Sequence, residues 1–167
     1  MHCVFISLMY PGRFSFKLRS AISPAAHFKI GDKGRIVLGD RVAVRRNSEL
    51  SVAEYGELTV GNRCFFNNNV HIACHEKITI GDGTRFGPGA KAFDHDYDYK
   101  DFQSGKHITS PIIIGNNVWI GANAVLLRGT QLGDGCVVAA GCVVKGIYPP
   151  NSLIIQKRHT EVSVIER

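Results

Sequence analysis

The segment from residue 94 to residue 101, DHDYDYKD, gathers four aspartates and one histidine within eight residues. The histidine is His95, and Asp94 and Asp96 flank it. An imidazole titrates near neutral pH and can act as a general base, while a nearby carboxylate can accept its second ring N–H and fix the tautomer. Histidine beside acids is also common at a solvated loop tip. The segment alone therefore leaves a catalytic and a structural interpretation open.

The stretch that follows this segment repeats with a period of six. Every sixth residue from 120 to 144 is aliphatic, and small residues lie four places after most of them. The two sets are Ile120, Leu126, Leu132, Val138 and Val144, and Ala124, Thr130, Cys136 and Cys142. A period of six fits the two-residue repeat of a strand and not the 3.6-residue repeat of a helix. Three such units close a triangular coil of about 18 residues, and coils stack through parallel strand pairing.

The same period recurs earlier in the chain and breaks once. It is visible in three further runs, 38–50, 60–72 and 80–92. Ala92 and Ile114 are then 22 positions apart, which is longer than one coil, so the excess must leave the stack as a loop. We predict an all-β solenoid over residues 30–148 with an extruded loop at 94–111. Because a stacked sheet exposes strand edges at both ends, the segments 1–29 and 149–167 are predicted to cap it.

The charge distribution and the apolar segments indicate which partners and which location to expect. The formal net charge is +6, and nine of the basic residues but only three acids fall in the first 50 residues. A positive surface attracts phosphate-bearing cofactors, anionic polymers or an acidic membrane surface, the last through the basic N-terminal segment. No nucleic-acid-binding motif is present, so nucleic acid is not an expected partner. Neither a secretory signal nor an apolar run of about 18 residues is found, which predicts a cytoplasmic protein.

The segment SPIIIGNNVWIGANAVLLRGTQLGDGCVVAAGCVVKGIYPPNS, with the repeats before it, resembles the hexapeptide-repeat acyltransferases. It is similar in particular to the galactoside and maltose acetyltransferases and to the polysaccharide O-acetyltransferases. The resemblance implies a left-handed parallel β-helix, acetyl-CoA as the acyl donor and a homotrimer with active sites between neighbouring subunits. The left hand follows from the resemblance alone, because crossovers between parallel strands are usually right-handed.

The resemblance also implies roles for particular residues. In the family a loop histidine 24 residues before the tryptophan of NNVWIG is the general base, and His95 precedes Trp119 by 24. Either Asp94 or Asp96 is then expected to orient the ring. Trp119 is expected to line the groove for donor and acceptor, and Asn67 aligns with a family asparagine that contacts the acceptor.

The implied donor site lies along the last coils. A backbone N–H near Gly121 or Ala122 is expected to bind the oxyanion. Ala122 and Ala140 match the small residues whose backbone groups bind the pantetheine arm in the family. Lys145 is one place out of the family register. Lys157 and Arg158 can neutralise phosphate, although the tail lacks the family's usual Gly-x-Pro pattern.

A metal site is not expected. His71 and His75 are spaced four residues apart, which does not bring two rings together on a strand, and His107 follows alone in the loop. The γ-carbonic anhydrases share the coil and bind zinc through three histidines, but there two close histidines follow a distant one. The histidines here are in the opposite order.

The sequence therefore predicts an acetyl-CoA-dependent O-acetyltransferase that acts on a sugar or polysaccharide hydroxyl by direct transfer. Two alternatives remain open at this point. The first is N-acetylation of an amino sugar or antibiotic, for which the same base would serve. The second is a non-catalytic β-helix scaffold, which would need neither His95 nor its register with Trp119.

Overall fold

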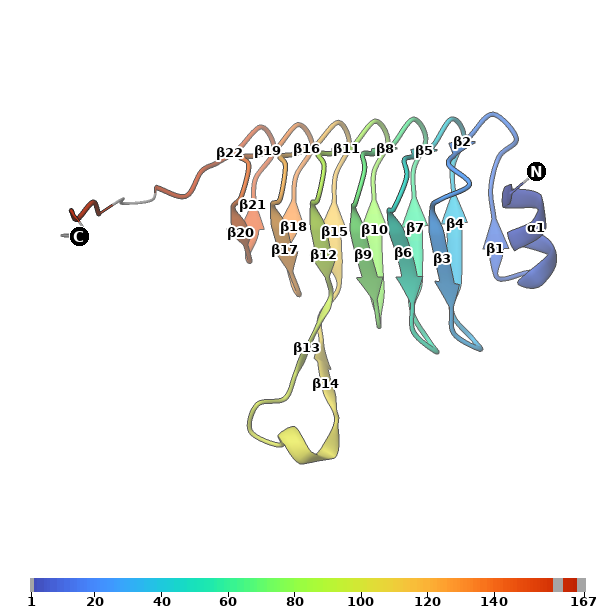
Figure 1. Ribbon diagram of the computed structural model, residues 1–167, viewed down its shortest axis with the longest axis horizontal. Helices are drawn as coiled ribbons and strands as arrows, with labels where there is room; N and C mark the ends of the chain where they lie inside the picture. Colours follow the sequence, from blue (N-terminus) through green and yellow to red (C-terminus); the bar gives the residue numbers. More distant parts are fainter. Residues whose placement is uncertain (1, 158–160, 165–167) are drawn as a thin grey trace.

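The computed structural model describes residues 2–157 and 161–164, and most of these residues wind into a parallel β-helix (Figure 1). Each coil contributes one strand to each of three sheets, which we call faces A, B and C. Face A contains β1 (Phe14–Ser15), β4 (Arg35–Leu38), β7 (Glu57–Val60), β10 (Lys77–Ile80), β15 (Ile112–Ile114), β18 (Gln131–Leu132) and β21 (Ile147–Tyr148). Face B contains β2 (Ala21–Ile22), β5 (Ala43–Val44), β8 (Phe65–Phe66), β11 (Arg85–Phe86), β16 (Trp119–Ile120), β19 (Val137–Val138) and β22 (Leu153–Ile154). Face C contains β3 (His27–Ile30), β6 (Glu49–Val52), β9 (His71–Cys74), β12 (Lys91–Phe93), β17 (Val125–Leu127) and β20 (Val143–Val144).

The residues that carry the six-residue period line the interior of the coil, as predicted. The five aliphatic residues from Ile120 to Val144 are at most 2% exposed, and each buried side chain of this size stabilises the fold by about 1.5–3 kcal/mol. Phe66 and Phe86 stack in the same interior, with ring centroids 4.9 Å apart. Cys136 and Cys142 are free and buried, which confirms that they pack as small apolar residues.

The break in the period is a hairpin that leaves the corner between faces C and A. β12 ends at Phe93, and the chain returns to face A at β15. Between them β13 (His95–Tyr97) and β14 (His107–Thr109) pair antiparallel, joined through the short 3₁₀ helix η1 (Phe102–Ser104). The hairpin projects away from the stack in Figure 1 and corresponds to the predicted loop at 94–111. It is the principal departure from a regular coil.

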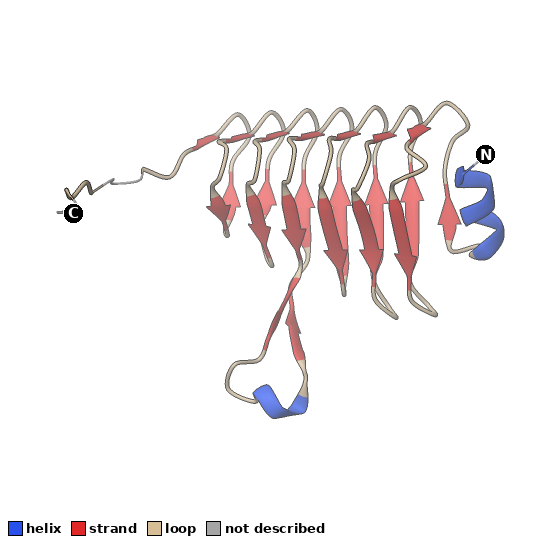
Figure 2. Cartoon of the chain, viewed as in Figure 1, coloured by secondary structure: helices blue, strands red, loops and turns tan. Residues whose placement is uncertain are grey.

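The stack of strands is longer than the predicted 30–148. β1, β2 and β3 form a first coil that begins at Phe14, and β22 extends the stack to Ile154. The helix α1 (His2–Met9) covers the first coil (Figure 2). Ile6 of this helix and Phe14 of the coil are both buried. This cap exposes Leu8, in the segment for which a membrane contact is predicted. In the described residues, no helix combines the length and apolar character needed to cross a membrane.

Candidate active site

The base of the hairpin is held by the buried side chain of Asp94, which immediately follows β12. Its Oδ1 accepts the backbone N–H of His75 at 2.7 Å, and its Oδ2 accepts those of Glu76 at 2.9 Å and Lys77 at 2.8 Å. Two of these donors lie in the turn between β9 and β10, and the third, Lys77, is the first residue of β10. Burial, and next the adjacent Asp94 carboxylate, raise the pKa of the Cys74 thiol, so this cysteine stays neutral and packs. Asp94 thus fixes the point at which the hairpin leaves the stack.

The same carboxylate orients the ring of His95. Nδ1 of His95 lies 3.2 Å from Oδ1 of Asp94, and the histidine side chain is 17% exposed. A carboxylate accepts hydrogen bonds, so this contact places the ring proton on Nδ1 and leaves the lone pair on Nε2. No hydrogen bond to Nε2 is present within the described part of the chain. Nε2 is therefore the atom available to take a proton from a substrate.

Two further histidines surround His95, and sequence reasoning missed both contacts. The ring of His75 stacks on that of His95, with centroids 3.5 Å apart and planes 12° from parallel. His107 packs edge-on against both rings, at 4.5 Å from His75 and 5.3 Å from His95. Burial, and next the nearby His95 and His107, lower the pKa of His75 and favour its neutral form. The hairpin register, which pairs Tyr97 with His107, brings the third ring back to the cluster.

Proximity alone makes this cluster a candidate metal site, since one nitrogen from each histidine lies within 4.8 Å of the others. The ring orientations do not fit an ion. An imidazole lone pair lies in the plane of its ring, and a zinc ion would have to lie about 2.0–2.1 Å from each nitrogen in that plane. The stacked planes of His75 and His95 are nearly parallel and do not converge on one point. His71 lies apart from the cluster, with Nε2 3.5 Å from Glu49.

The second predicted orienting acid is not brought to the ring. Asp96 is exposed on β13, pairs in register with Ile108, and among the described residues makes no hydrogen bond or ion pair with the ring of His95. Side chains alternate along a strand, so a residue one place beyond His95 points away from the face that carries the imidazole. Of the two acids that flank His95, Asp94 is the one that orients it.

The residues predicted to bind the acceptor lie on face B. Trp119 on β16 is 59% exposed and pairs in register with Arg85 on β11. Asn67 follows β8, is half-buried, and its side-chain oxygen accepts the backbone N–H of Asn68 at 2.8 Å. A shallow pocket of about 380 Å³ is lined by Phe65, Asn67, Arg85, Phe86, Gly87 and Trp119. The structure thus places Asn67 and Trp119 in one groove.

The small residues predicted to bind the donor form a column at the corner between faces B and C. A side-chain carbon on Gly121 would lie 2.5 Å from the backbone nitrogen of Ala140 in the next coil, so only glycine fits there. The N–H of Gly121 donates to Val138, which removes it as an oxyanion donor. The N–H of Ala122 has no acceptor among the described residues, and neither has that of Ala140. These two amides are free to bind a ligand.

The predicted basic residues are divided between two places. Lys145 follows β20 and is exposed at the corner between faces C and A, the corner from which the hairpin leaves. Lys157 is exposed beyond β22, at the end of the stack. Arg158 lies outside the described residues.

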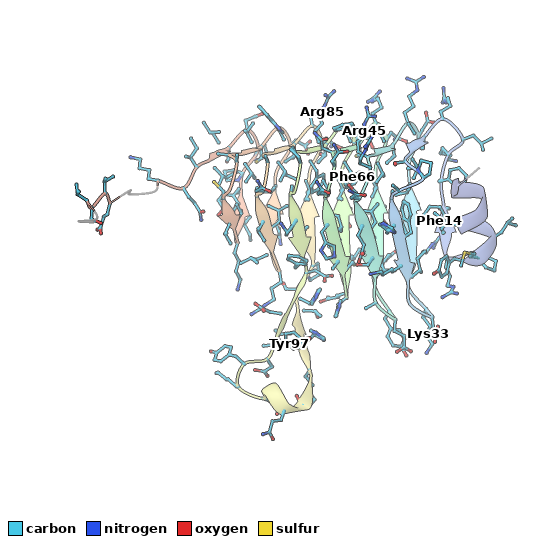
Figure 3. All side chains as sticks on the ribbon, in the orientation of Figure 1. Phe14, Lys33, Arg45, Phe66, Arg85 and Tyr97 are labelled. Carbon is cyan, nitrogen blue, oxygen red and sulfur yellow. The ribbon has the colours of Figure 1, made fainter. Side chains whose placement is uncertain are left out.

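The histidine cluster and the groove on face B lie on opposite sides of one chain. In a triangular coil, the corner between faces C and A is opposite face B. Figure 3 shows Tyr97 on the hairpin at one side of the stack and Arg45 and Arg85 at the other. His95 and the predicted acceptor residues Asn67 and Trp119 therefore do not meet within a single chain.

The sequence is similar to that of known acetyltransferases. The family model "Hexapeptide repeat of succinyl-transferase" matches residues 111–145. An Escherichia coli K12 protein, provisionally named a lipopolysaccharide biosynthesis O-acetyl transferase, is 30% identical over 138 residues, which are 75% of this chain and 69% of that protein. The galactoside O-acetyltransferase of the same bacterium is 34% identical over 100 residues, 58% of this chain and 49% of that enzyme. The chain thus spans between half and about two thirds of the length of these relatives.

Solved structures share the coil. A hexapeptide-repeat acetyltransferase from Vibrio cholerae, in complex with acetyl-CoA, is 28% identical, with a TM-score of 0.57 over 82% of this chain and 62% of that one. An N-acyltransferase from Bacillus cereus superposes with a TM-score of 0.72 over 92% of this chain and 90% of that one, at 20% identity, which shows a common fold alone. Coil, hairpin and sequence together place this chain in the hexapeptide-repeat acetyltransferase family.

Proposed function

We propose that the protein is an acetyl-CoA-dependent O-acetyltransferase that acts on a sugar or polysaccharide hydroxyl. The observation that carries the proposal is the contact between Asp94 and His95, which holds Nδ1 protonated and leaves Nε2 free. The family, and a structural neighbour that binds acetyl-CoA, support the donor. A relative named galactoside O-acetyltransferase supports a sugar acceptor.

The proposed transfer is direct. Nε2 of His95 takes the proton of the acceptor hydroxyl while its oxygen attacks the thioester carbonyl of acetyl-CoA. The tetrahedral intermediate then collapses, the carbon–sulfur bond breaks, and the imidazolium returns the proton to the departing thiolate of CoA. Asp94 stabilises the imidazolium through Nδ1. General base catalysis of this kind contributes about 10²- to 10⁴-fold.

The oxyanion of the intermediate needs a donor, and we assign this role to the N–H of Ala122. The neighbouring N–H of Gly121 is engaged by Val138, whereas that of Ala122 has no acceptor among the described residues. The close fit of Gly121 against Ala140 holds this corner rigid. A preorganised backbone donor costs little reorganisation as charge develops.

The active site is proposed to form between copies of the chain, in a homotrimer. His95 and Trp119 lie on opposite sides of one stack, so one chain cannot present both to the same substrate. If a second copy packs side by side, the hairpin of one chain faces face B of the next. Sedimentation analysis is expected to give a trimer, and a monomer at assay concentration would contradict this arrangement.

Release of free thiol from acetyl-CoA, measured against a panel of acceptors, tests the proposed activity. The expected result is release with sugars that offer a hydroxyl and none with amines. Release confined to amino sugars would replace the proposal with N-acetylation. No release with any acceptor, together with no binding of acetyl-CoA by calorimetry, would replace it with a scaffold.

A further inference from the structure

Face B differs from the other two faces in its charge. Its seven strands contain no aspartate or glutamate. Faces A and C instead pair their cations with acids, as Lys77 does with Glu57 at 3.7 Å and Lys29 with Glu49 at 2.9 Å. Positive charge on face B is therefore not compensated by neighbouring strands.

Three arginines stand on this acid-free face or at its edge. Arg45 follows β5, Arg46 comes next at the corner with face C, and Arg85 lies on β11. All three are exposed, and within the described residues no carboxylate lies within ion-pairing distance of any of them. The guanidinium carbon of Arg45 lies 5.7 Å from the ring centroid of Phe65, a contact that orients this side chain along the face. Figure 3 shows Arg45 and Arg85 on the same side of the stack.

The arginines line two adjoining pockets. One pocket, of about 450 Å³, is lined by Ser23, Arg45, Arg46, Phe65, Asn67 and Asn68. The other is the pocket that holds Arg85 and Trp119, and the two share Phe65 and Asn67. The two pockets form one groove that has Arg45, Arg46 and amides at one end and Arg85 beside the exposed indole of Trp119 at the other.

We propose that this groove binds an acceptor sugar that carries an oxyanion, either a carboxylate or a phosphate. The proposal rests on the proposed function and names its substrate class. The exposed ring of Trp119 offers an apolar surface for the sugar, and Arg85 and the Arg45–Arg46 pair bind the anionic group. Guanidinium groups match carboxylates and phosphates with paired N–H donors. Asn67 and Asn68 supply amides for neighbouring hydroxyls.

The position of the arginines separates them from the proposed donor site. The same corner between faces B and C carries a column of corresponding residues, in the order Arg46, Asn68, Pro88, Ala122 and Ala140. The half with Ala122 and Ala140 has free amides and small side chains, which suit a pantetheine arm. The half with Arg46 and Asn68 lies on the other side of Trp119 along the stack. The arginines therefore face the acceptor and not the phosphates of CoA.

Matched acceptors test the inference. The probes are methyl glucoside, methyl glucuronide and glucose 1-phosphate, assayed for acetylation with acetyl-CoA and for binding by calorimetry in the presence of CoA. We expect an anionic probe to exceed the neutral one in kcat/KM, and the preferred one distinguishes carboxylate from phosphate. Arg46→Gln and Arg85→Gln should each lower kcat/KM for that probe about tenfold or more, and should lower it much less for the neutral sugar. Arg35→Gln, a matched exposed arginine on face A, should change neither.

Three outcomes overturn the inference. One is equal kcat/KM for neutral and anionic probes, and another is an equal loss for both probes in the arginine variants. The third is a rise in the KM for acetyl-CoA in these variants, which would assign the arginines to the donor. Anion binding that depends on Arg46 and Arg85 without acetylation of any alcohol would instead sustain the site and contradict the proposed function.

Discussion

The hairpin corner and face B differ in how their side chains are packed and exposed. At the corner, a buried carboxylate and three histidines are packed together, and their contacts cross from one coil to the next. On face B, the exposed Trp119 and Arg85 lie on regular strands, and Arg45 and Arg46 follow another strand. The corner thus holds the groups proposed for proton transfer, whereas face B displays the groups proposed to recognise a ligand.

This separation is the reason for proposing that a second copy completes the active site. A coil holds its faces rigidly, so a single chain cannot bring the corner round to face B. If the chemistry takes place at the corner and recognition on face B, as proposed, packing of two chains is a condition of activity. Each region can then be altered separately, and the following substitutions test the role proposed for each.

The largest expected effect on the corner is loss of the base. His95→Ala should lower kcat about 10²- to 10⁴-fold, because Nε2 is the only atom assigned to take the proton. Steady-state kinetics measures the loss, and thermal melting should show an unchanged fold. His27→Ala, at an exposed histidine on β3, is the control. Near-normal turnover by His95→Ala would remove the assignment.

On face B the comparable effect is expected from Ala122→Pro, which deletes one free N–H. Pro88 occupies the corresponding corner of the preceding coil, so a proline is compatible with this backbone. No intramolecular hydrogen bond is lost, and the melting temperature should hold. The kcat should fall about 10²- to 10³-fold, as for removal of an oxyanion donor. A variant with unchanged kcat would show that the donor lies elsewhere, and Ala122→Gly serves as control.

The next largest effect is expected on the free energy of unfolding, through the buried Asp94 at the hairpin corner. Asp94→Asn turns an NH₂ group toward backbone donors, and at about 1–3 kcal/mol per unsatisfied group the free energy of unfolding should fall by about 2–4 kcal/mol. Urea denaturation measures it. Asp96→Asn, in the same hairpin but exposed, should change the free energy of unfolding by less than about 0.5 kcal/mol. Equal effects of the two substitutions would contradict the anchoring role of Asp94.

The smallest expected effect is on the pH dependence of folding stability. The pKa of His75 is lowered in the fold, so the unfolded chain binds a proton more readily. His75 therefore contributes fully to folding stability above its unfolded pKa of about 6.5. This contribution to stability is lost as the pH falls from there through the lowered pKa of the folded protein. Urea denaturation between pH 8 and 5 should show a shallower loss of stability in His75→Gln than in wild type. If stability falls with pH equally in the two proteins, the pKa of His75 is not lowered in the fold. His27→Gln, at an exposed histidine, is the control.

The sequence predicts the coil well because its cause is local. A residue such as Ile120 repeats every six positions, and the packing of one coil on the next requires little else. The first coil is harder to predict, because only Phe16, Ile22 and Phe28 carry the period there and all three are partly exposed. The extruded loop is also predictable, since the count between Ala92 and Ile114 exceeds one coil.

The detail of the site is less accessible from sequence, because it depends on contacts across coils. The contact of His75 with His95 joins two successive coils, and that of His107 depends on the hairpin register. The choice of Asp94 over Asp96 follows from which side chain is buried. The unpaired arginines are recognised only once the strands are aligned and face B proves free of acids.

Subunit complementation tests the central claim most directly, namely that the corner of one chain works with face B of another. His95→Ala supplies an intact face B, and Ala122→Pro supplies an intact corner. When the two nearly inactive variants are unfolded together in equal amounts and refolded, random assembly into trimers should give about a quarter of the sites two intact halves. Activity should then recover to about a quarter of wild type. Activity no greater than the mean of the two variants refolded separately would contradict the account.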